Sequence, residues 1–160
     1  MSNPHETFSS KAQDQSHPLV LVVEDHDDTR EMLELLLQVF GCSVVTAENG
    51  VKALTLAEQA HPDLILMDMR IPQLDGFTVT RRIRASATLN QVPIIAVTGL
   101  ATPKDQAAAR DAGCTEYLEK PIDLDRLEEL VKSLTRSGFT MRTQSVLPSK
   151  WTYNYRTHIA

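Results

Sequence analysis

Five polar side chains that could act together in one chemical site each follow a short apolar stretch of the chain. They are Glu24, Asp25, Asp68, Thr98 and Lys120. Carboxylates held close together repel one another, so a site with three of them needs a cation or raised pKa values. Mg²⁺ suits a few carboxylates combined with water and phosphate oxygens. In such a site Asp68 could be a carboxylate nucleophile toward a phosphoryl group, which Lys120 and Thr98 could contact as cation and hydrogen-bond donor.

The apolar stretches predict the strands that would position these residues. Those at 19–23, 64–67 and 94–97 are continuous runs rich in Val, Ile and Leu, typical of a parallel sheet covered on both faces. Weaker strands fit residues 43–46 and 116–118. Because ligands of open parallel sheets bind at the carboxyl ends of the strands, we expect the five polar residues to meet there.

Helical patterns separate the predicted strands. The clearest has Met32, Leu36 and Phe40 at four-residue spacing, and Gly41 would end this helix. Four more helices are predicted after it, beginning near Val51 and Phe77, spanning residues 104–112, and running from Leu124 to Leu134. Five strands that alternate with five helices predict a doubly wound α/β sheet.

Other polar residues near the site have structural interpretations. Asp28 and Glu31 form a capping-box pattern at the start of the first helix. Asp27, Asp28 and Asp75 each precede a helical stretch and are predicted helix caps. His26 directly follows the acid pair, but Mg²⁺ prefers oxygen ligands, so we expect the His26 side chain to face solvent.

Four motifs, in order along the chain, resemble those of the receiver domain of two-component response regulators. They are VVEDHDD at 22–28, DLILMDMRIPQLDGF at 63–77, VTG at 97–99 and EYLEKP at 116–121. Asp25, Asp68, Thr98 and Lys120 are separated by 43, 30 and 22 residues, as in that family. The resemblance covers about residues 18–135 and is greatest to single-domain regulators. It implies a flavodoxin-like five-stranded parallel sheet, in the order 2-1-3-4-5, with five helices.

The resemblance also implies a phosphoacceptor site that uses Mg²⁺. Asp68 would accept a phosphoryl group from the phosphohistidine of a sensor histidine kinase or a histidine phosphotransfer protein. Glu24, Asp25 and Asp68 would bind the ion together with the backbone carbonyl of Arg70. Such a protein dephosphorylates itself slowly and relays a signal, so it is not expected to be an enzyme that acts on outside substrates.

Four further residues have roles that the resemblance implies. Lys120 would form an ion pair with the phosphoryl group, and the bond between Lys120 and Pro121 would be cis. Thr98 and Tyr117 would be a switch pair. Their movement would alter the face made by the fourth helix, fifth strand and fifth helix, where a downstream protein target would dock.

Arg70 and Leu100 occupy positions two residues beyond Asp68 and Thr98. In the receiver family these positions influence the access of attacking water to the phosphoryl group. Our hypothesis is that the bulky Arg70 and the apolar Leu100 slow hydrolysis. The alternative is that both are loop residues with no such role.

Three other functions fit the sequence less well. A Rossmann-type nucleotide site needs a glycine-rich turn, whereas the turn here is EDHDD. An aspartyl phosphatase of the haloacid dehalogenase type needs a second Asp two residues after the nucleophile, and this chain has Arg70 there. The main alternative is a receiver-like interaction module that works without phosphorylation.

Charge divides the chain into three parts. The formal charge of −5 combines −1 over residues 1–17, −8 over 18–135 and +4 over 136–160. We therefore predict an N-terminal segment at 1–17, a receiver domain at 18–135 and a basic tail at 136–160, which holds four of the eight aromatics. Protein docking is the favoured role for the tail, a homodimer contact is another, and nucleic acid ranks well behind, since no recognised DNA-binding module fits those 25 residues.

The remaining features favour a cytoplasmic protein. No apolar run reaches the roughly 18–20 residues that cross a bilayer, and the N-terminus has no apolar signal core. Cys42 and Cys114 lie far apart and are expected to be reduced core residues rather than a disulfide.

Overall fold

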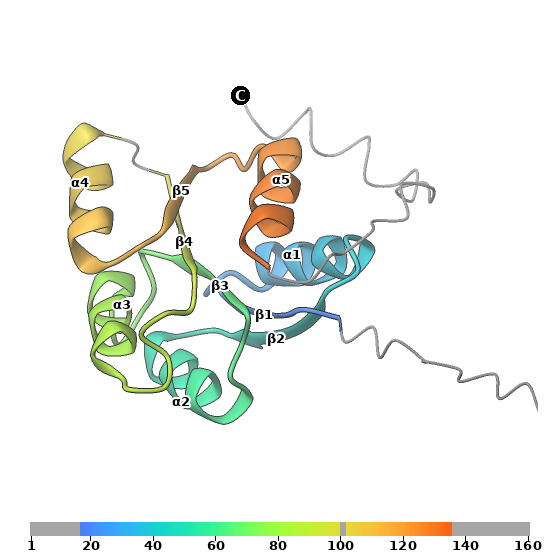
Figure 1. Ribbon diagram of the computed structural model, residues 1–160. Helices are drawn as coiled ribbons and strands as arrows, with labels where there is room; N and C mark the ends of the chain where they lie inside the picture. The colour runs from blue at the N-terminus through green and yellow to red at the C-terminus, as the bar shows by residue number, and fades with distance from the viewer. Residues whose placement is uncertain (1–16, 100–101, 136–160) are drawn as a thin grey trace, which may run out of the picture.

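The computed structural model describes residues 17–99 and 102–135. Five parallel strands form one sheet in the order β2-β1-β3-β4-β5, and a helix follows each strand (Figure 1). The elements are β1 Leu19–Val23, α1 Asp27–Val39, β2 Ser43–Ala47, α2 Gly50–Ala60, β3 Leu64–Asp68, α3 Gly76–Ala85, β4 Ile94–Thr98, α4 Pro103–Ala112, β5 Glu116–Glu119 and α5 Leu124–Leu134. The predicted doubly wound, flavodoxin-like sheet is confirmed, and four strands extend one residue further than predicted.

Helices cover both faces of the sheet, with α1 and α5 on one side and α2, α3 and α4 on the other (Figure 1). Successive strand residues point to opposite faces. In β1, Val20 and Val22 pack in the core with α1 and α5, whereas Leu21 and Val23 pack in the core with the other three helices. This explains why the central strands are continuous apolar runs, because both faces of each strand are buried.

The start of α1 differs from the prediction. The helix begins at Asp27, and its N-cap residue is His26, whose side chain makes no capping hydrogen bond. Asp27 and Asp28 therefore lie in the first turn, and the predicted caps and the capping box with Glu31 are wrong. Asp27 instead pairs with Arg30, and carboxylates in a first turn are favoured by the positive end of the helix dipole.

The turn from β3 to α3 is tightly packed. Asp75 is the N-cap of α3, as predicted, and its Oδ1 accepts a hydrogen bond from the Thr78 backbone N–H at 3.0 Å. A Cβ atom on Gly76 would lie 2.7 Å from both the Asp68 carbonyl oxygen and Met69 Cα. Only glycine therefore allows α3 to begin so close to the end of β3, where Asp68 lies.

The two cysteines are free thiols, as expected. Cys42 is buried in the core beneath α1, and burial raises its pKa to about 11. Cys114 is half-buried against the core on the opposite face. Within residues 17–99 and 102–135, we find no helix with the length and apolar character needed to cross a membrane. Leu100, the tail at 136–160 and residues 1–16 lie outside the described residues.

Candidate phosphoacceptor and metal site

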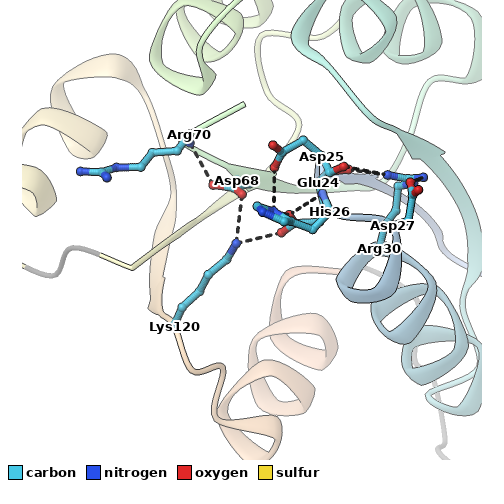
Figure 2. A network of polar contacts seen from close by, with 8 residues as sticks. All are labelled: Glu24, Asp25, His26, Asp27, Arg30, Asp68, Arg70 and Lys120. Atoms are coloured by element: carbon cyan, nitrogen blue, oxygen red, sulfur yellow. Dashed lines mark hydrogen bonds and ion pairs between the residues drawn. The ribbon is translucent and has the colours of Figure 1, made fainter. Parts of the chain in front are cut away.

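Four different strands bring the predicted site residues to one edge of the sheet. Glu24 and Asp25 follow β1, Asp68 ends β3, Thr98 ends β4, and Lys120 follows β5. Figure 2 shows the Lys120 side chain reaching across from β5 toward the carboxylates of Asp68 and Glu24. Because β3 lies between β1 and β4, Asp68 occupies the middle of this edge.

Lys120 joins two buried carboxylates. Its Nζ donates to Glu24 Oε2 at 2.9 Å and to Asp68 Oδ2 at 3.0 Å. Glu24 is only 1% exposed and Asp68 only 4%. The other Asp68 oxygen, Oδ1, accepts a hydrogen bond from the Arg70 backbone N–H at 2.9 Å. Both oxygens of Asp68 are thus fixed, which orients this carboxylate at the edge of the sheet.

Burial and the hydrogen bonds of Lys120 shift the pKa values of these groups. Burial raises the pKa of Asp68 above its ordinary value, despite the hydrogen bonds from Arg70 and Lys120. Burial alone would also raise the pKa of Glu24, but hydrogen bonds from Lys120 and from the His26 backbone hold it below its ordinary value. The pKa of Lys120 is raised because its hydrogen bonds to both carboxylates outweigh burial. The single ammonium of Lys120 therefore forms ion pairs with two carboxylates.

Asp25 provides the test of whether a divalent cation fits this pocket. Its Oδ1 atom is buried and makes no hydrogen bond with any residue that the structure describes. His26 Nδ1 lies 3.1 Å from this oxygen, but the two lack hydrogen-bond geometry. A buried carboxylate oxygen without a donor is costly unless a cation satisfies it. Carboxylate oxygens are the ligands that Mg²⁺ prefers, so this atom, within 4.8 Å of a Glu24 oxygen, fits a divalent cation.

Sequence reasoning missed Arg30 and the contact that His26 makes with Glu24. Arg30 Nη1 donates to the Glu24 carbonyl oxygen at 3.0 Å, while its other nitrogen pairs with Asp27. The spacing of Asp27 and Arg30 is the only signal that could have suggested part of this arrangement. His26 is exposed, as predicted, but its Nδ1 also lies 3.0 Å from Glu24 Oε1 (Figure 2).

Thr98 and Tyr117 lie together at the β4–β5 end of the site. Thr98 is buried, and its carbonyl oxygen accepts a hydrogen bond from the Lys120 backbone N–H at 2.8 Å. Tyr117 is half-buried; burial and the charges of Asp105 and Glu119 raise its pKa, while a side-chain hydrogen bond with Thr98 opposes this. The structure thus joins the two residues of the predicted switch pair.

The last site predictions concern the loops beyond β3, β4 and β5. The peptide bond between Lys120 and Pro121 is cis, as predicted. Arg70 is exposed, and its backbone contacts Asp68. Leu100 falls outside the described residues, so its predicted place beside Thr98 stays a prediction.

The chain is similar to response regulators and receiver domains from bacteria. A family model for the response regulator receiver domain matches residues 20–132. The polar-differentiation response regulator DivK of Brucella ovis is 37% identical over 114 residues, covering 71% of this chain and 93% of DivK.

Solved structures agree with this assignment. The receiver domain of sensor histidine kinase PA1611 from Pseudomonas aeruginosa, which has a magnesium ion in its active site cleft, is 36% identical, with a TM-score of 0.71 over 76% of this chain and 99% of that domain. Chemotaxis protein CheY4 of Vibrio cholerae is 29% identical, with a TM-score of 0.70 over 74% of this chain and 98% of CheY4. This chain therefore belongs to the response regulator receiver family.

Proposed function

We propose that this protein is a phosphoryl acceptor, in which Asp68 receives the phosphoryl group from the phosphohistidine of a sensor histidine kinase or a histidine phosphotransfer protein. The placement of Asp68 carries this proposal. Its buried carboxylate is held by the Arg70 backbone on one oxygen and by the Lys120 ammonium on the other. A carboxylate oriented in this way can present an oxygen to an incoming phosphorus atom.

The transfer needs little covalent chemistry from the protein. An oxygen of Asp68 forms a bond to phosphorus as the bond between phosphorus and the donor histidine nitrogen breaks, and the product is an acyl phosphate. Mg²⁺, when bound, supplies positive charge that offsets the charge of the phosphoryl oxygens. Glu24, Asp25 and Asp68, with the Arg70 carbonyl, are the residues that would hold the ion. Lys120, which donates a hydrogen bond to Asp68 Oδ2, would form an ion pair with the phosphoryl group after transfer.

The signal would leave the site through Thr98 and Tyr117. Thr98 can donate its hydroxyl hydrogen to a phosphoryl oxygen, and this would compete with its present hydrogen bond with Tyr117. A change in the position of Tyr117 would alter the surface formed by α4, β5 and α5. We propose this surface as the docking site of a downstream protein target, with release of the phosphoryl group by slow self-hydrolysis.

The relatives support this role at the level of the family. DivK is described as a polar-differentiation response regulator, and the PA1611 receiver holds magnesium in its cleft. By analogy we propose that residues 18–135 act as a single-domain receiver in the cytoplasm, flanked by segments 1–17 and 136–160. Docking to another protein, or to a second copy of the chain, is the proposed role of the basic tail.

Phosphorylation with a small-molecule phosphodonor tests the proposal. We expect intact-mass spectrometry to show one added phosphoryl group when acetyl phosphate and Mg²⁺ are present, and none when a chelator removes the ion. Asp68→Asn should abolish the labelling. Asp111→Asn is the matched control, because Asp111 is exposed on α4 and should not affect it.

Three results would contradict the proposal. Equal labelling of the Asp68→Asn protein would place the phosphoryl group elsewhere. Sustained turnover of a phosphomonoester in the presence of Mg²⁺ would indicate a phosphatase, and full signalling output from Asp68→Asn in cells would indicate a module that works without phosphorylation.

A further inference from the structure

His26 turns its ring toward the acid pair although most of its side chain faces solvent. Its Nδ1 lies 3.0 Å from Glu24 Oε1 and 3.1 Å from Asp25 Oδ1, with 73% of the side chain exposed. The His26 backbone is fixed as well, because its N–H donates to Glu24 Oε1 at 3.1 Å and its carbonyl accepts from Arg30 N–H at 2.9 Å. The ring is therefore held beside the two carboxylates by the position of His26 at the start of α1.

One hydrogen bond cannot satisfy His26 Nδ1, Glu24 Oε1 and Asp25 Oδ1 together. His26 Nδ1 can carry one hydrogen, which can be donated to Glu24 Oε1 at 3.0 Å. Asp25 Oδ1 is then left buried and without a hydrogen-bond donor among the described residues. An ion placed between the three atoms would contact all of them, with the ring hydrogen on the outer nitrogen, Nε2.

The distances fit such an ion. Two ligands on an ion with bonds of about 2.1 Å lie about 3.0 Å apart at right angles and about 3.4 Å apart at the tetrahedral angle that zinc prefers. The two separations from His26 Nδ1, 3.0 and 3.1 Å, lie at or near this range. One ligand atom from each of Glu24, Asp25 and His26 also lies within 4.8 Å of the others. Little movement would be needed to close these side chains around one ion.

The chemistry of the donor set points to a different metal from the all-oxygen set. Mg²⁺ prefers oxygen ligands, whereas imidazole nitrogen combined with carboxylate oxygens suits zinc and other late first-row ions. These ions also bind a given nitrogen and oxygen site more tightly than the earlier members of the row. A nitrogen ligand beside the acid pair should therefore raise the affinity of the site for Zn²⁺ relative to Mg²⁺.

We propose that His26 is a metal ligand that lets the pocket bind Zn²⁺ through Glu24, Asp25 and His26, in competition with Mg²⁺. This inference rests on the proposed Mg²⁺ site, because both ions would use the same two carboxylates. Zn²⁺ would then regulate the receiver by occupying the position that phosphoryl transfer requires for Mg²⁺.

Competitive titration of Zn²⁺ against a chromophoric chelator tests the proposal in the 160-residue chain without a purification tag. His26→Asn should weaken Zn²⁺ binding by at least about tenfold and lower the ratio of the Mg²⁺ to the Zn²⁺ dissociation constant. Asn is a good N-cap residue, so α1 should keep its start. His61→Asn is the matched control, because His61 is exposed and has a φ of 48°, a conformation that Asn tolerates. It should leave Zn²⁺ affinity within about twofold of wild type.

Long-range ¹H–¹⁵N spectra provide an independent readout. The Nδ1 resonance of His26 should move on addition of ZnCl₂ and should not show the same change with MgCl₂. Equal Zn²⁺ affinity of wild type and His26→Asn, or an unmoved His26 resonance, would overturn the inference. Phosphorylation of wild-type Asp68 by acetyl phosphate with Mg²⁺ and no Zn²⁺ separates the proposed function from the Zn²⁺ site. If Asp68 is labelled but Zn²⁺ binding does not depend on His26, only the Zn²⁺ site is contradicted. If Zn²⁺ binding depends on His26 but Asp68 is not labelled, the proposed function is contradicted and the Zn²⁺ site is supported.

Discussion

Lys120 compensates two buried carboxylates with one ammonium, so its removal should be costly. In Lys120→Gln, Glu24 and Asp68 lose their shared ion-pair partner. We expect unfolding in denaturant without Mg²⁺ to show a loss of about 2–4 kcal/mol, at the lower side of the cost of breaking a buried pair because Lys120 is itself 29% exposed. Adding Mg²⁺ should recover part of this loss.

The matched control is Lys132→Gln. Lys132 pairs with Glu128 at 2.8 Å on the surface of α5, and such exposed pairs contribute less than about 1 kcal/mol. A similar loss of stability in both variants would contradict the compensating role of Lys120.

Arg70 allows a second test at the level of single residues. Its side chain is exposed, while its backbone N–H holds Asp68 Oδ1, so replacing the side chain should leave the contact to Asp68 in place. If the bulky side chain hinders attacking water, Arg70→Ala should release the phosphoryl group several-fold faster in a decay assay. We expect Leu100→Ala to act in the same direction. Unchanged decay rates in both variants would leave these residues without a role in hydrolysis.

The turn between β3 and α3 positions Asp68, and Gly76 is the element-level test of this. A Cβ at Gly76 would lie 2.7 Å from the Asp68 carbonyl oxygen, so Gly76→Ala forces the turn away from β3. Despite the conformational advantage of Ala over Gly in a helix, we expect a loss of about 1–3 kcal/mol and slower labelling of Asp68.

Gly99→Ala is the control for stability in the same set of measurements. A Cβ at Gly99 would meet no atom of another residue that the structure describes within 4 Å, its chain neighbours aside, so the effect of Gly99→Ala on unfolding should be within about 0.5 kcal/mol. If Gly76→Ala is as stable as Gly99→Ala and accepts phosphoryl groups at the wild-type rate, the turn does not position Asp68.

The sequence predicted the strands of this fold but not the start of α1. Strands were predictable because β1, β3 and β4 are buried on both faces and read as continuous apolar runs. Once these strands were located, the polar residues that follow them could be predicted to meet at one edge of the sheet. The start of α1 was not, because Asp27 pairs with Arg30 instead of capping the helix. The contacts of Arg30 and His26 with Glu24 depend on the path of the chain after β1, which no local sequence pattern predicts.

At the scale of the whole molecule, charge is distributed unevenly. The segment 18–135 carries −8, which includes the acidic pocket, while 136–160 carries +4 with four aromatic residues. If the tail docks to a partner or a second copy, deleting 139–160 should change the rate of phosphotransfer from a kinase or the oligomeric mass in solution. No change in either would leave the tail without a docking role.

The central claim is that phosphoryl transfer ends on Asp68, and chemical trapping tests it most directly. The phosphorylated protein is reduced with borohydride, which converts an acyl phosphate to an alcohol, and the modified residue is located by peptide mass spectrometry. The account predicts that the modification lies at Asp68, requires Mg²⁺ and is absent without a phosphodonor. A modification at any other residue, or none after exposure to a phosphodonor and Mg²⁺, would contradict it.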